Sequence, residues 1–534
     1  MCGIFAYISN KKIDNETNKL ILKSNGMKIQ YRGPDNTVST IINDKIFLMF
    51  HRLCINDLSD AGNQPLYHPD NDNLILICNG EIYNYCDLIK EYNFKMKSKS
   101  DCEVILHMYK KFGIDKTIKS LDGVFSLILI DNDNNKIYCA RDPIGVRSLY
   151  IGYGNDGETA IASELKAIHK ISNNITQFKP GCYMEINNNN LYTRYYDYVY
   201  PTISGIEQEV IMENIRNLLE KGVKKRLLSD RPIGCLLSGG LDSSLITALV
   251  AKFMDNKTKL KTFSVGLENS VDIVCARKVA KYLDTDHYEL ILTEKEMIES
   301  IDKDIELIET YDTTTIRAST PMYLLCKYIK ENTDITVIFS GEGSDEASGS
   351  YLYFHNAPSP DEFKKETIRL MEDLSYFDVL RADKSSACCG LEIRVPFLDR
   401  FFLKYYMSID PNLKMPSKFG IEKFLLRKAY DNSNLLPDDI LWRKKEGMSD
   451  GVSSQKKGWF QIIQEHINSK MSDLEYEELK KKYVSNTPNT KESMYFREKF
   501  NEFYPNCDHL IPYYWLPKWC GEISEPSARI LNCY

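Results

Sequence analysis

Long apolar runs, long basic blocks and a secretory signal are all missing from this sequence. A membrane-spanning helix needs about 18 or more consecutive apolar residues, and no such run is present. The formal net charge is −7, and no basic block is long enough to follow a nucleic-acid backbone. The first residues lack the basic and apolar regions of a signal peptide. We therefore expect a cytoplasmic protein that binds small molecules and neither nucleic acid nor a membrane. The sequence does not decide whether the protein forms a homodimer.

Cysteine pairs at the spacing of a structural zinc site are also absent. The chain has 15 cysteines, an odd number, scattered over 534 residues, so we expect reduced thiols rather than a disulfide framework. The length suits two to four domains, and a hydrophobic content of 43% supports large packed cores.

Apolar patterns predict a β-rich first domain over residues 2–195. Helical patterns occur near residues 16–30 and 102–112, and Asp101 stands where a carboxylate suits a helix N-terminus. Many strands and few helices indicate two stacked sheets with helices outside. The predicted strands cover residues 46–50, 74–78, 125–130, 137–140 and 160–162.

Cys2 is a candidate nucleophile. Removal of Met1, which is usual before a small residue, would leave a thiol and a free α-amine on one amino acid. The amine titrates near pH ~8 and the thiol near ~8.5, so the amine can serve as the base that activates the thiol. A Met-Cys start seen alone is more often a processing site without chemistry.

Two polar groups follow predicted strands in this domain. Asn79-Gly80 alone indicates a turn, but the Asn79 amide and the Gly80 backbone N–H could also form an oxyanion hole. Arg52 could pair with a substrate carboxylate as a two-pronged donor, or form a surface ion pair.

Short motifs in this domain resemble the class II glutamine amidotransferases. They are Cys2-Gly3-Ile4, Arg32-Gly33-Pro34-Asp35, His51-Arg52-Leu53, Asn79-Gly80-Glu81-Ile82-Tyr83-Asn84 and Ser100-Asp101-Cys102-Glu103. The resemblance implies an N-terminal-nucleophile αββα sandwich, with Cys2 as nucleophile and Asn79 and Gly80 as the oxyanion hole. It further implies that Arg52 holds the glutamine α-carboxylate and that Asp101, with Glu81, holds its ammonium group. The implied glutamine-binding residues are Arg52, Leu53, Cys54, Ile55, Asn56, Asn79, Gly80, Glu81 and Asp101.

A linker over residues 196–208 precedes a second domain, residues 209–534. A helical period over 209–227 leads to an apolar strand and then to Ser238-Gly239-Gly240-Leu241-Asp242-Ser243-Ser244. A glycine turn at the start of a helix can bind an anion. The pattern here is not that of a Walker loop. It resembles the pyrophosphate-holding loop of ATP pyrophosphatases, which cleave ATP to AMP and pyrophosphate. A generic glycine-rich turn is the alternative.

Strands and helices then alternate, which predicts a parallel sheet with ligands at the carboxyl ends of its strands. Ser238, Val265 and Ser340 lie near such ends and should converge. Asp345, in the acidic turn 340–346, could hold Mg²⁺ together with Asp242; a solvated acidic loop is the alternative. The predicted strands are 260–267, 287–292 and 336–339, and the predicted helices are 243–253, 271–283, 294–310 and 320–331.

Three further segments, residues 309–324, 394–399 and 442–451, resemble the glutamine-hydrolysing asparagine synthetase family. The resemblance runs from Cys2 to Arg529 and implies an α/β chain. The αββα sandwich would be followed by a parallel-sheet ATP-pyrophosphatase domain, similar to the adenine nucleotide alpha-hydrolases, with C-terminal helices. ATP would contact Leu237, Ser238, Gly239, Gly240, Asp242, Ser243, Val265, Ser340, Gly341 and Lys445.

The implied reaction is that of a ligase. Cys2 would form a thioester with the glutaminyl group and release ammonia, which an enclosed passage would deliver to the second site. There, aspartate and Mg-ATP would give β-aspartyl-AMP, with support from Glu342 and with Lys445 over the phosphates. Aspartate would bind near Glu342 and residues 313–317.

One stretch departs from the family. Ala347-Ser348-Gly349-Ser350-Tyr351 replaces the usual hydrophobic-Phe-Gly-Gly-Tyr run, which could leave a cavity or shift the backbone beside the Mg²⁺ turn. Two alternatives remain. Another amidating or cyclising ATP enzyme, such as a β-lactam synthetase relative, would not need Cys2. A non-catalytic relative that regulates a partner is supported only by the altered stretch.

Overall fold

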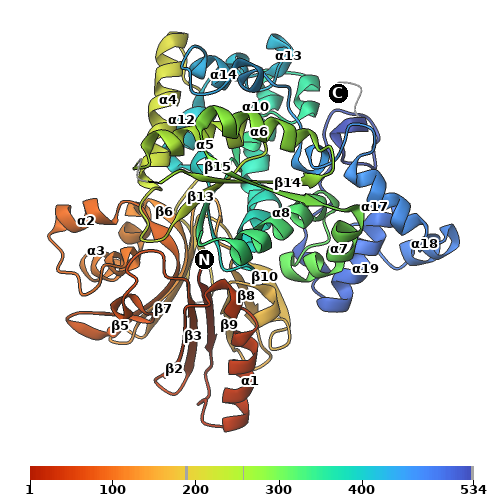
Figure 1. Ribbon diagram of the computed structural model, residues 1–534. Helices are drawn as coiled ribbons and strands as arrows, with labels where there is room; N and C mark the ends of the chain where they lie inside the picture. The colour runs from red at the N-terminus through yellow and green to blue at the C-terminus, as the bar shows by residue number, and fades with distance from the viewer. Residues whose placement is uncertain (187–189, 256–257, 531–534) are drawn as a thin grey trace. The chain divides into compact units, whose positions relative to one another are not determined.

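Figure 1 shows the computed structural model, which describes residues 1–186, 190–255 and 258–530. The chain divides into two units, each with its own core. Unit 1 contains Met1–Asp197, Leu228–Pro232 and Ser386–Glu392. Unit 2 contains the rest of the described chain, beginning at Tyr198.

Two six-stranded sheets make up unit 1, and all their strand pairs are antiparallel. All five predicted strands are confirmed, and further short strands complete the sheets. The first sheet has the order β10 (Asn174–Gln177), β8 (Tyr150–Tyr153), β9 (Thr159–Ala162), β1 (Gly3–Ile8), β3 (Ile46–Arg52) and β2 (Asn36–Ile42). The second has the order β12 (Tyr192–Arg194), β11 (Cys182–Glu185), β7 (Lys136–Arg141), β6 (Gly123–Asp131), β5 (Asn71–Ile82) and β4 (Leu66–His68).

The sheets of unit 1 stack through a shared apolar layer. Ile4 and Phe50 from the first sheet meet Ile77 and Ile128 from the second. Helix α1 (Glu16–Met27) covers the outer side of the first sheet. Helices α2 (Tyr85–Tyr92) and α3 (Val104–Ser120) cover the second. The predicted αββα sandwich is therefore confirmed.

The helix predicted over residues 102–112 is longer than its pattern suggested. A 3-10 turn, Asp101–Glu103, leads into α3, which continues to Ser120 across a non-helical break at Gly113. Asp101 does not cap this helix, because its carboxylate accepts the backbone N–H of Ile82.

Unit 2 contains a sheet of five strands. Strands β13, β14, β15 and β16 pair in parallel, which confirms the predicted parallel sheet. Figure 1 shows α5 (Leu241–Phe253) and α6 (Val271–Leu283) on one face and α7 (Glu294–Ile308) and α8 (Thr313–Asn332) on the other. The strand order is β15 (Asp286–Leu292), β14 (Lys261–Leu267), β13 (Ile233–Leu236), β16 (Val337–Phe339) and β17 (Glu392–Arg394).

Helix α8 begins seven residues before the predicted start at residue 320, because Asp312 caps it at 2.9 Å from the Thr315 N–H. Pro321 therefore lies inside the helix and lacks the N–H that would bond the carbonyl of Arg317. The indole N–H of Trp459 donates to this carbonyl oxygen at 3.1 Å. A tertiary contact thus replaces the missing helical hydrogen bond.

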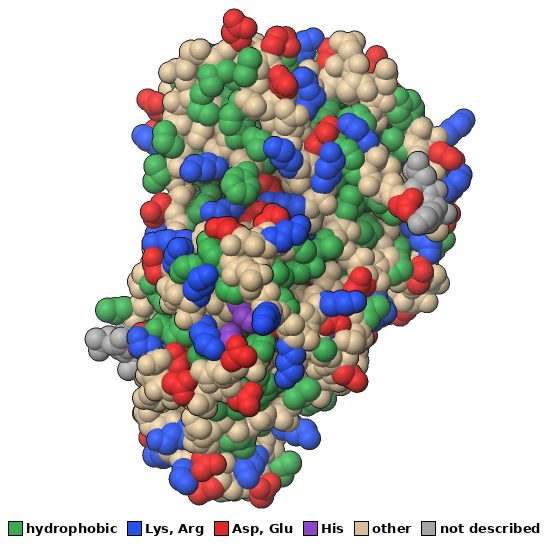
Figure 2. All heavy atoms as spheres, turned by 90° about the vertical axis from the view of Figure 1, so that its left-hand side faces the viewer, with side chains coloured by type: hydrophobic (Ala, Val, Ile, Leu, Met, Phe, Trp, Pro, Cys, Tyr) green, Lys and Arg blue, Asp and Glu red, His purple; other side chains and the backbone are tan. Residues whose placement is uncertain are grey.

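Helices make up most of the remaining part of unit 2. Helix α4 (Gln208–Lys225) precedes the sheet, and its span confirms the helical period at 209–227. No helix in the described part of the chain is both long and apolar enough to cross a membrane. Positive and negative side chains are interspersed over the face shown in Figure 2. The later helices are α9 (Ser344–Ser348), α10 (Pro360–Asp373), α11 (Asp378–Ala387), α12 (Arg400–Ser408), α13 (Pro416–Phe419), α14 (Phe424–Tyr430), α15 (Asp438–Leu441), α16 (Met448–Gly451), α17 (Trp459–Asn468), α18 (Asp473–Lys480) and α19 (Lys491–Phe503).

Candidate active sites

Cys2 lies immediately before β1, and its thiol faces the chain that follows β3. The sulfur accepts the Leu53 N–H at 3.4 Å and lies 3.7 Å from the Leu53 carbonyl oxygen. The guanidinium of Arg32 donates to the Cys2 carbonyl oxygen at 3.0 Å and pairs with Glu164 at 2.7 Å. The Arg-Gly-Pro-Asp motif therefore begins with a buried arginine that fixes the backbone of the candidate nucleophile.

With Met1 in place, the nitrogen of Cys2 is part of a peptide bond and cannot serve as the base for its own thiol. The Met1 amine is buried and donates to the Leu391 carbonyl oxygen at 3.2 Å. Burial raises the pKa of the Cys2 thiol to about 12, while the nearby N-terminal charge lowers it. Burial also lowers the pKa of the Met1 amine to about 5. A thiol with so high a pKa is protonated at neutral pH and is a poor nucleophile.

The segment 52–57 begins at the last residue of β3 and includes Leu53, which contacts the Cys2 sulfur. Asp35 accepts the Cys54 N–H at 2.8 Å, and Arg231 donates to the Cys54 carbonyl oxygen at 2.9 Å. The Arg52 guanidinium bonds Ser59 at 2.7 Å and Asn63 at 2.8 Å, and also the Asp57 carbonyl. In this structure Arg52 holds the following loop in place.

Two carboxylates of unit 1 are brought together by one amide. Asn56 donates to Glu81 at 2.5 Å and to Asp101 at 3.5 Å. Asp101 also accepts the Ile82 N–H at 2.6 Å, and burial raises the pKa of its carboxyl group to about 6. Two adjacent carboxylates of this kind suit a cationic ammonium group.

Asn79 and Gly80 lie inside strand β5, so the turn that this dipeptide indicates when seen alone is not formed. Gly80 pairs with Phe125, and a Cβ atom at Gly80 would lie 2.3 Å from the Val124 carbonyl oxygen. This close approach requires glycine in the strand. The side chain of Asn79 is 1% exposed, and neither of its polar atoms has a hydrogen-bond partner among the residues that the structure describes. A buried amide without a partner is available to a ligand.

The glycine turn of unit 2 joins β13 to α5. Gly239 has a φ of 72°, and a Cβ atom there would come within 2.5 Å of the Ala276 nitrogen. Ser238 and Ser243 lie 2.9 Å apart through their hydroxyl oxygens. The turn opens on a cavity of about 190 Å³ whose lining includes Ser238, Gly240, Asp242, Ser243, Ser340, Gly341, Glu342, Asp345 and Lys445.

Val265 lines a smaller adjoining cavity of about 40 Å³ with Leu237 and Ser238. Ser238 thus belongs to both cavities, and Ser340 lines the larger one. The expected convergence of three strand ends is confirmed.

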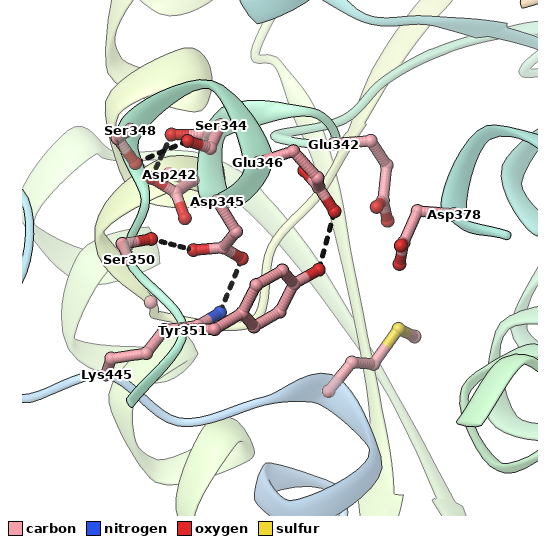
Figure 3. Close-up of polar contacts among 12 residues, drawn as sticks. Asp242, Glu342, Ser344, Asp345, Glu346, Ser348, Ser350, Tyr351, Asp378 and Lys445 are labelled. Atoms are coloured by element: carbon pink, nitrogen blue, oxygen red, sulfur yellow. Dashed lines mark hydrogen bonds and ion pairs between the residues drawn. The ribbon is translucent and has the colours of Figure 1, made fainter. Parts of the chain in front are cut away.

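Asp242 and Asp345 converge on a lysine that the motifs did not single out. The Lys423 ammonium lies 2.5 Å from an oxygen of each carboxylate. Lys445 pairs with the other oxygen of Asp345 at 2.6 Å, as Figure 3 shows. Within residues 1–186, 190–255 and 258–530, no group of three or more His, Cys, Asp or Glu side chains is arranged to hold a metal ion.

Glu342 lies beside a second residue that sequence reasoning missed. Arg381 donates to Glu342 at 2.7 Å and to Asp378 at 3.1 Å. Burial raises the pKa of Glu342, and the charge of Arg381 lowers it. Figure 3 shows Glu342, Glu346 and Asp378 close together, and all three line the larger cavity.

Only part of the segment 313–317, near which we expect aspartate to bind, lies at the larger cavity. Thr314 lines the larger cavity, whereas Arg317 is not among its described lining residues. Arg317 is 2% exposed and forms ion pairs with Glu492 and Glu525, each at 2.5 Å. Two carboxylates, of which that of Glu492 is buried, therefore occupy the Arg317 guanidinium.

The altered stretch 347–350 is well packed. Ala347, Ser348 and Ser350 are at most 2% exposed. A Cβ atom on Gly349 would lie 2.5 Å from the ring of Phe363. The ring of Phe363 from α10 therefore packs directly against this turn.

Comparisons with known proteins agree over the whole chain. A family described as asparagine synthase matches residues 214–369 and 356–523, and a glutamine amidotransferase domain matches residues 1–204. The glutamine-hydrolysing asparagine synthetase of Gallus gallus is 43% identical over 563 aligned residues, covering 100% of this chain and 99% of that protein. The enzyme of Homo sapiens is 42% identical over the same coverage. A glutamine phosphoribosylpyrophosphate amidotransferase structure from B. subtilis is 18% identical, with a TM-score of 0.32, and covers 47% of this chain and 64% of its own.

Proposed function

The chain belongs to the glutamine-hydrolysing asparagine synthetase family, and we propose that it makes L-asparagine from L-aspartate with L-glutamine as nitrogen donor and ATP as driving reactant. L-glutamate, AMP and pyrophosphate would be the other products. The observation that carries the proposal is 43% identity to such a synthetase over the full chain. The first domain, residues 2–195, would release ammonia from glutamine. A linker, residues 196–208, would join it to the second domain, residues 209–534, which would form the amide of asparagine.

Glutamine hydrolysis would take place beside Cys2. Once Met1 is removed, the Cys2 amine would take the thiol proton, and the sulfur would attack the side-chain amide carbon of glutamine. The charge that develops on oxygen would be stabilised by the unpartnered Asn79 amide and the Gly80 N–H. Ammonia would leave, and water would cleave the resulting thioester to glutamate.

Glutamine would be oriented by groups on either side of the thiol. Asp101 and Glu81, which Asn56 already joins, would bind its ammonium group. Arg52 would bind its α-carboxylate, which requires part of its present bonding to the loop to give way. Leu53, Cys54 and Ile55 would form the adjoining wall.

ATP would occupy the two adjoining cavities of unit 2. Leu237 and Val265, in the smaller cavity, would contact the adenosine part together with Ser340 and Gly341. Ser238, Gly239, Gly240 and Ser243 would present the glycine turn and helix N-terminus to the phosphates. Lys445 would stabilise the charge that develops when aspartate attacks the α-phosphate.

Aspartate would bind beside Glu342 and Thr314. Arg381 offers a positive group for one of its carboxylates, and the carboxyl oxygens of Asp378 and Glu346 would accept hydrogen bonds from its ammonium. These side chains line the same cavity as the glycine turn. Glu342 would support formation of β-aspartyl-AMP, from which ammonia displaces AMP.

Asp242 and Asp345 fit a magnesium ion. Both carboxylates already lie 2.5 Å from a shared cationic nitrogen, that of Lys423, and carboxylate oxygens are ligands that Mg²⁺ prefers. Two protein ligands suffice, since Mg²⁺ takes its remaining ligands from phosphates and water. When bound, the ion would neutralise phosphate charge during the displacement.

Substitution of the nucleophile separates the two halves of this proposal. Cys2→Ala should abolish glutamine-dependent asparagine formation and leave ammonia-dependent formation intact. Cys86→Ala, at an exposed cysteine, is the control and should retain both activities. Loss of both activities in a folded Cys2→Ala protein would contradict the two-site account.

A further inference from the structure

The turn that follows α9 folds back onto that helix. Gly349 ends the helix with a φ of 62°, in the left-handed region. The next backbone N–H, that of Ser350, then donates to the Asp345 carbonyl oxygen at 3.1 Å. This turn brings the side chain of residue 350 over the side chain of residue 345, as Figure 3 shows.

The hydroxyl group of Ser350 is bonded directly to a candidate metal ligand. Ser350 is fully buried, at 0% exposed, and its Oγ donates to Asp345 Oδ1 at 2.5 Å. Lys423 contacts the same oxygen at 2.5 Å, whereas Lys445 contacts Oδ2 at 2.6 Å. The two oxygens of this carboxylate are therefore not equivalent: among the described side chains, Oδ1 has two donors and Oδ2 has one.

The three donors differ in what they would do when a cation arrives. The ammonium groups of Lys423 and Lys445 are positive and are carried on flexible stems, so a divalent ion would repel them. The Ser350 hydroxyl is neutral, and its short side chain stands on a turn fixed by backbone hydrogen bonds. It is thus the donor that can stay in place with a cation or a phosphate chain nearby.

We propose that Ser350 is a positioning residue for Asp345. Its hydroxyl group fixes the rotation of the carboxylate, so that Oδ1 stays beside the Asp242 carboxylate, at the place that the Lys423 ammonium holds in this structure and where the cation would bind. This assignment rests on the proposed function of the cavity, and it gives the departure at position 350 a role in that site.

The test measures cation binding without turnover. Mn²⁺ replaces Mg²⁺ as an electron paramagnetic resonance probe, and its dissociation constant is measured with an ATP analogue that has a methylene group between the α- and β-phosphates. Ser350→Ala should weaken Mn²⁺ binding about tenfold, the effect of losing one hydrogen bond to a charged group. Ser350→Thr, which restores a hydroxyl group, should bring binding back to within about twofold.

Ser348→Ala is the matched control. Ser348, the last residue of α9, is nearly as buried as Ser350, at 2% exposed, but its hydroxyl donates to the Ser344 carbonyl oxygen at 2.5 Å and bonds no described carboxylate. Its substitution should leave Mn²⁺ binding unchanged. If Ser350→Ala does not fold, Ser350→Gly removes the same hydroxyl group and takes its place.

Equal Mn²⁺ binding by the unaltered chain and by a folded Ser350 variant without the hydroxyl group would overturn the proposal. So would an equal loss in Ser348→Ala, because the effect would then belong to the packing of the turn. Since the measurement needs no product, failure of the unaltered chain to make asparagine would count against the proposed function alone.

Discussion

The ammonium group of Lys423 lies 2.5 Å from Oδ2 of Asp242, although the two residues are 181 positions apart in the chain. The same nitrogen lies 2.5 Å from Asp345. A buried lysine thus balances two carboxylates at the place where the proposed reaction needs a divalent cation. We therefore expect Lys423 to stabilise this pair of carboxylates when Mg²⁺ is absent, and Mg²⁺ to stabilise the same pair when it is bound.

Lys423→Met should destabilise unit 2 when Mg²⁺ is absent. Removal of one partner leaves two partly buried like charges together, which lowers the free energy of unfolding by on the order of 3 kcal/mol. Mg²⁺ should restore much of the loss, and thermal melting with and without the ion measures both effects. Lys428→Met, at an exposed lysine of α14 paired with Asp431 at 2.7 Å, should change stability by less than about 0.5 kcal/mol. Equal melting of the two variants would contradict this account.

Trp459→Phe should lower the free energy of unfolding by about 1–3 kcal/mol, because the Arg317 carbonyl oxygen would lose its donor. Pro321→Ala supplies the missing N–H within α8, so the loss should be smaller in the double variant. Denaturant unfolding of the four proteins gives the coupling between the two positions. Additive effects would mean that the indole N–H does not substitute for the helical hydrogen bond.

Glutamine hydrolysis should weaken in mild acid. The pKa of Asp101 is raised by burial to about 6, so this carboxyl group is ionised above that pH and neutral below it. A neutral Asp101 attracts an ammonium group less, and kcat/KM for glutamine should fall as the pH drops through about 6. Asp101→Asn should have a lower kcat/KM that no longer depends on pH in this range. An identical acid limb in both proteins would assign it to another group.

Sequence patterns predicted those elements whose signal is local. The helix predicted at residues 271–283 coincides with α6, and the strand predicted at 260–267 differs from β14 by one residue. In both cases the apolar period of a single segment already specifies the buried face. The glycine turn at residues 238–244 was found for the same reason, since its chemistry lies within one short segment.

Contacts between distant segments could not be predicted in this way. Arg317 lies in the segment that the sequence places near aspartate. Its partners, Glu492 and Glu525, lie 175 and 208 residues later in the chain. The dipeptide Asn79-Gly80 is typical of a turn, yet pairing with β6 places it inside strand β5. Lys423 has no motif around it, and only the fold brings it to Asp345.

The most direct test is product analysis with the purified, full-length protein after mass spectrometry has shown that its N-terminus is Cys2. The protein is incubated with aspartate, Mg-ATP and glutamine. The account predicts asparagine, AMP and pyrophosphate in equal amounts, with at least as much glutamate. Glutamate without asparagine, or ADP and phosphate in place of AMP and pyrophosphate, would contradict it.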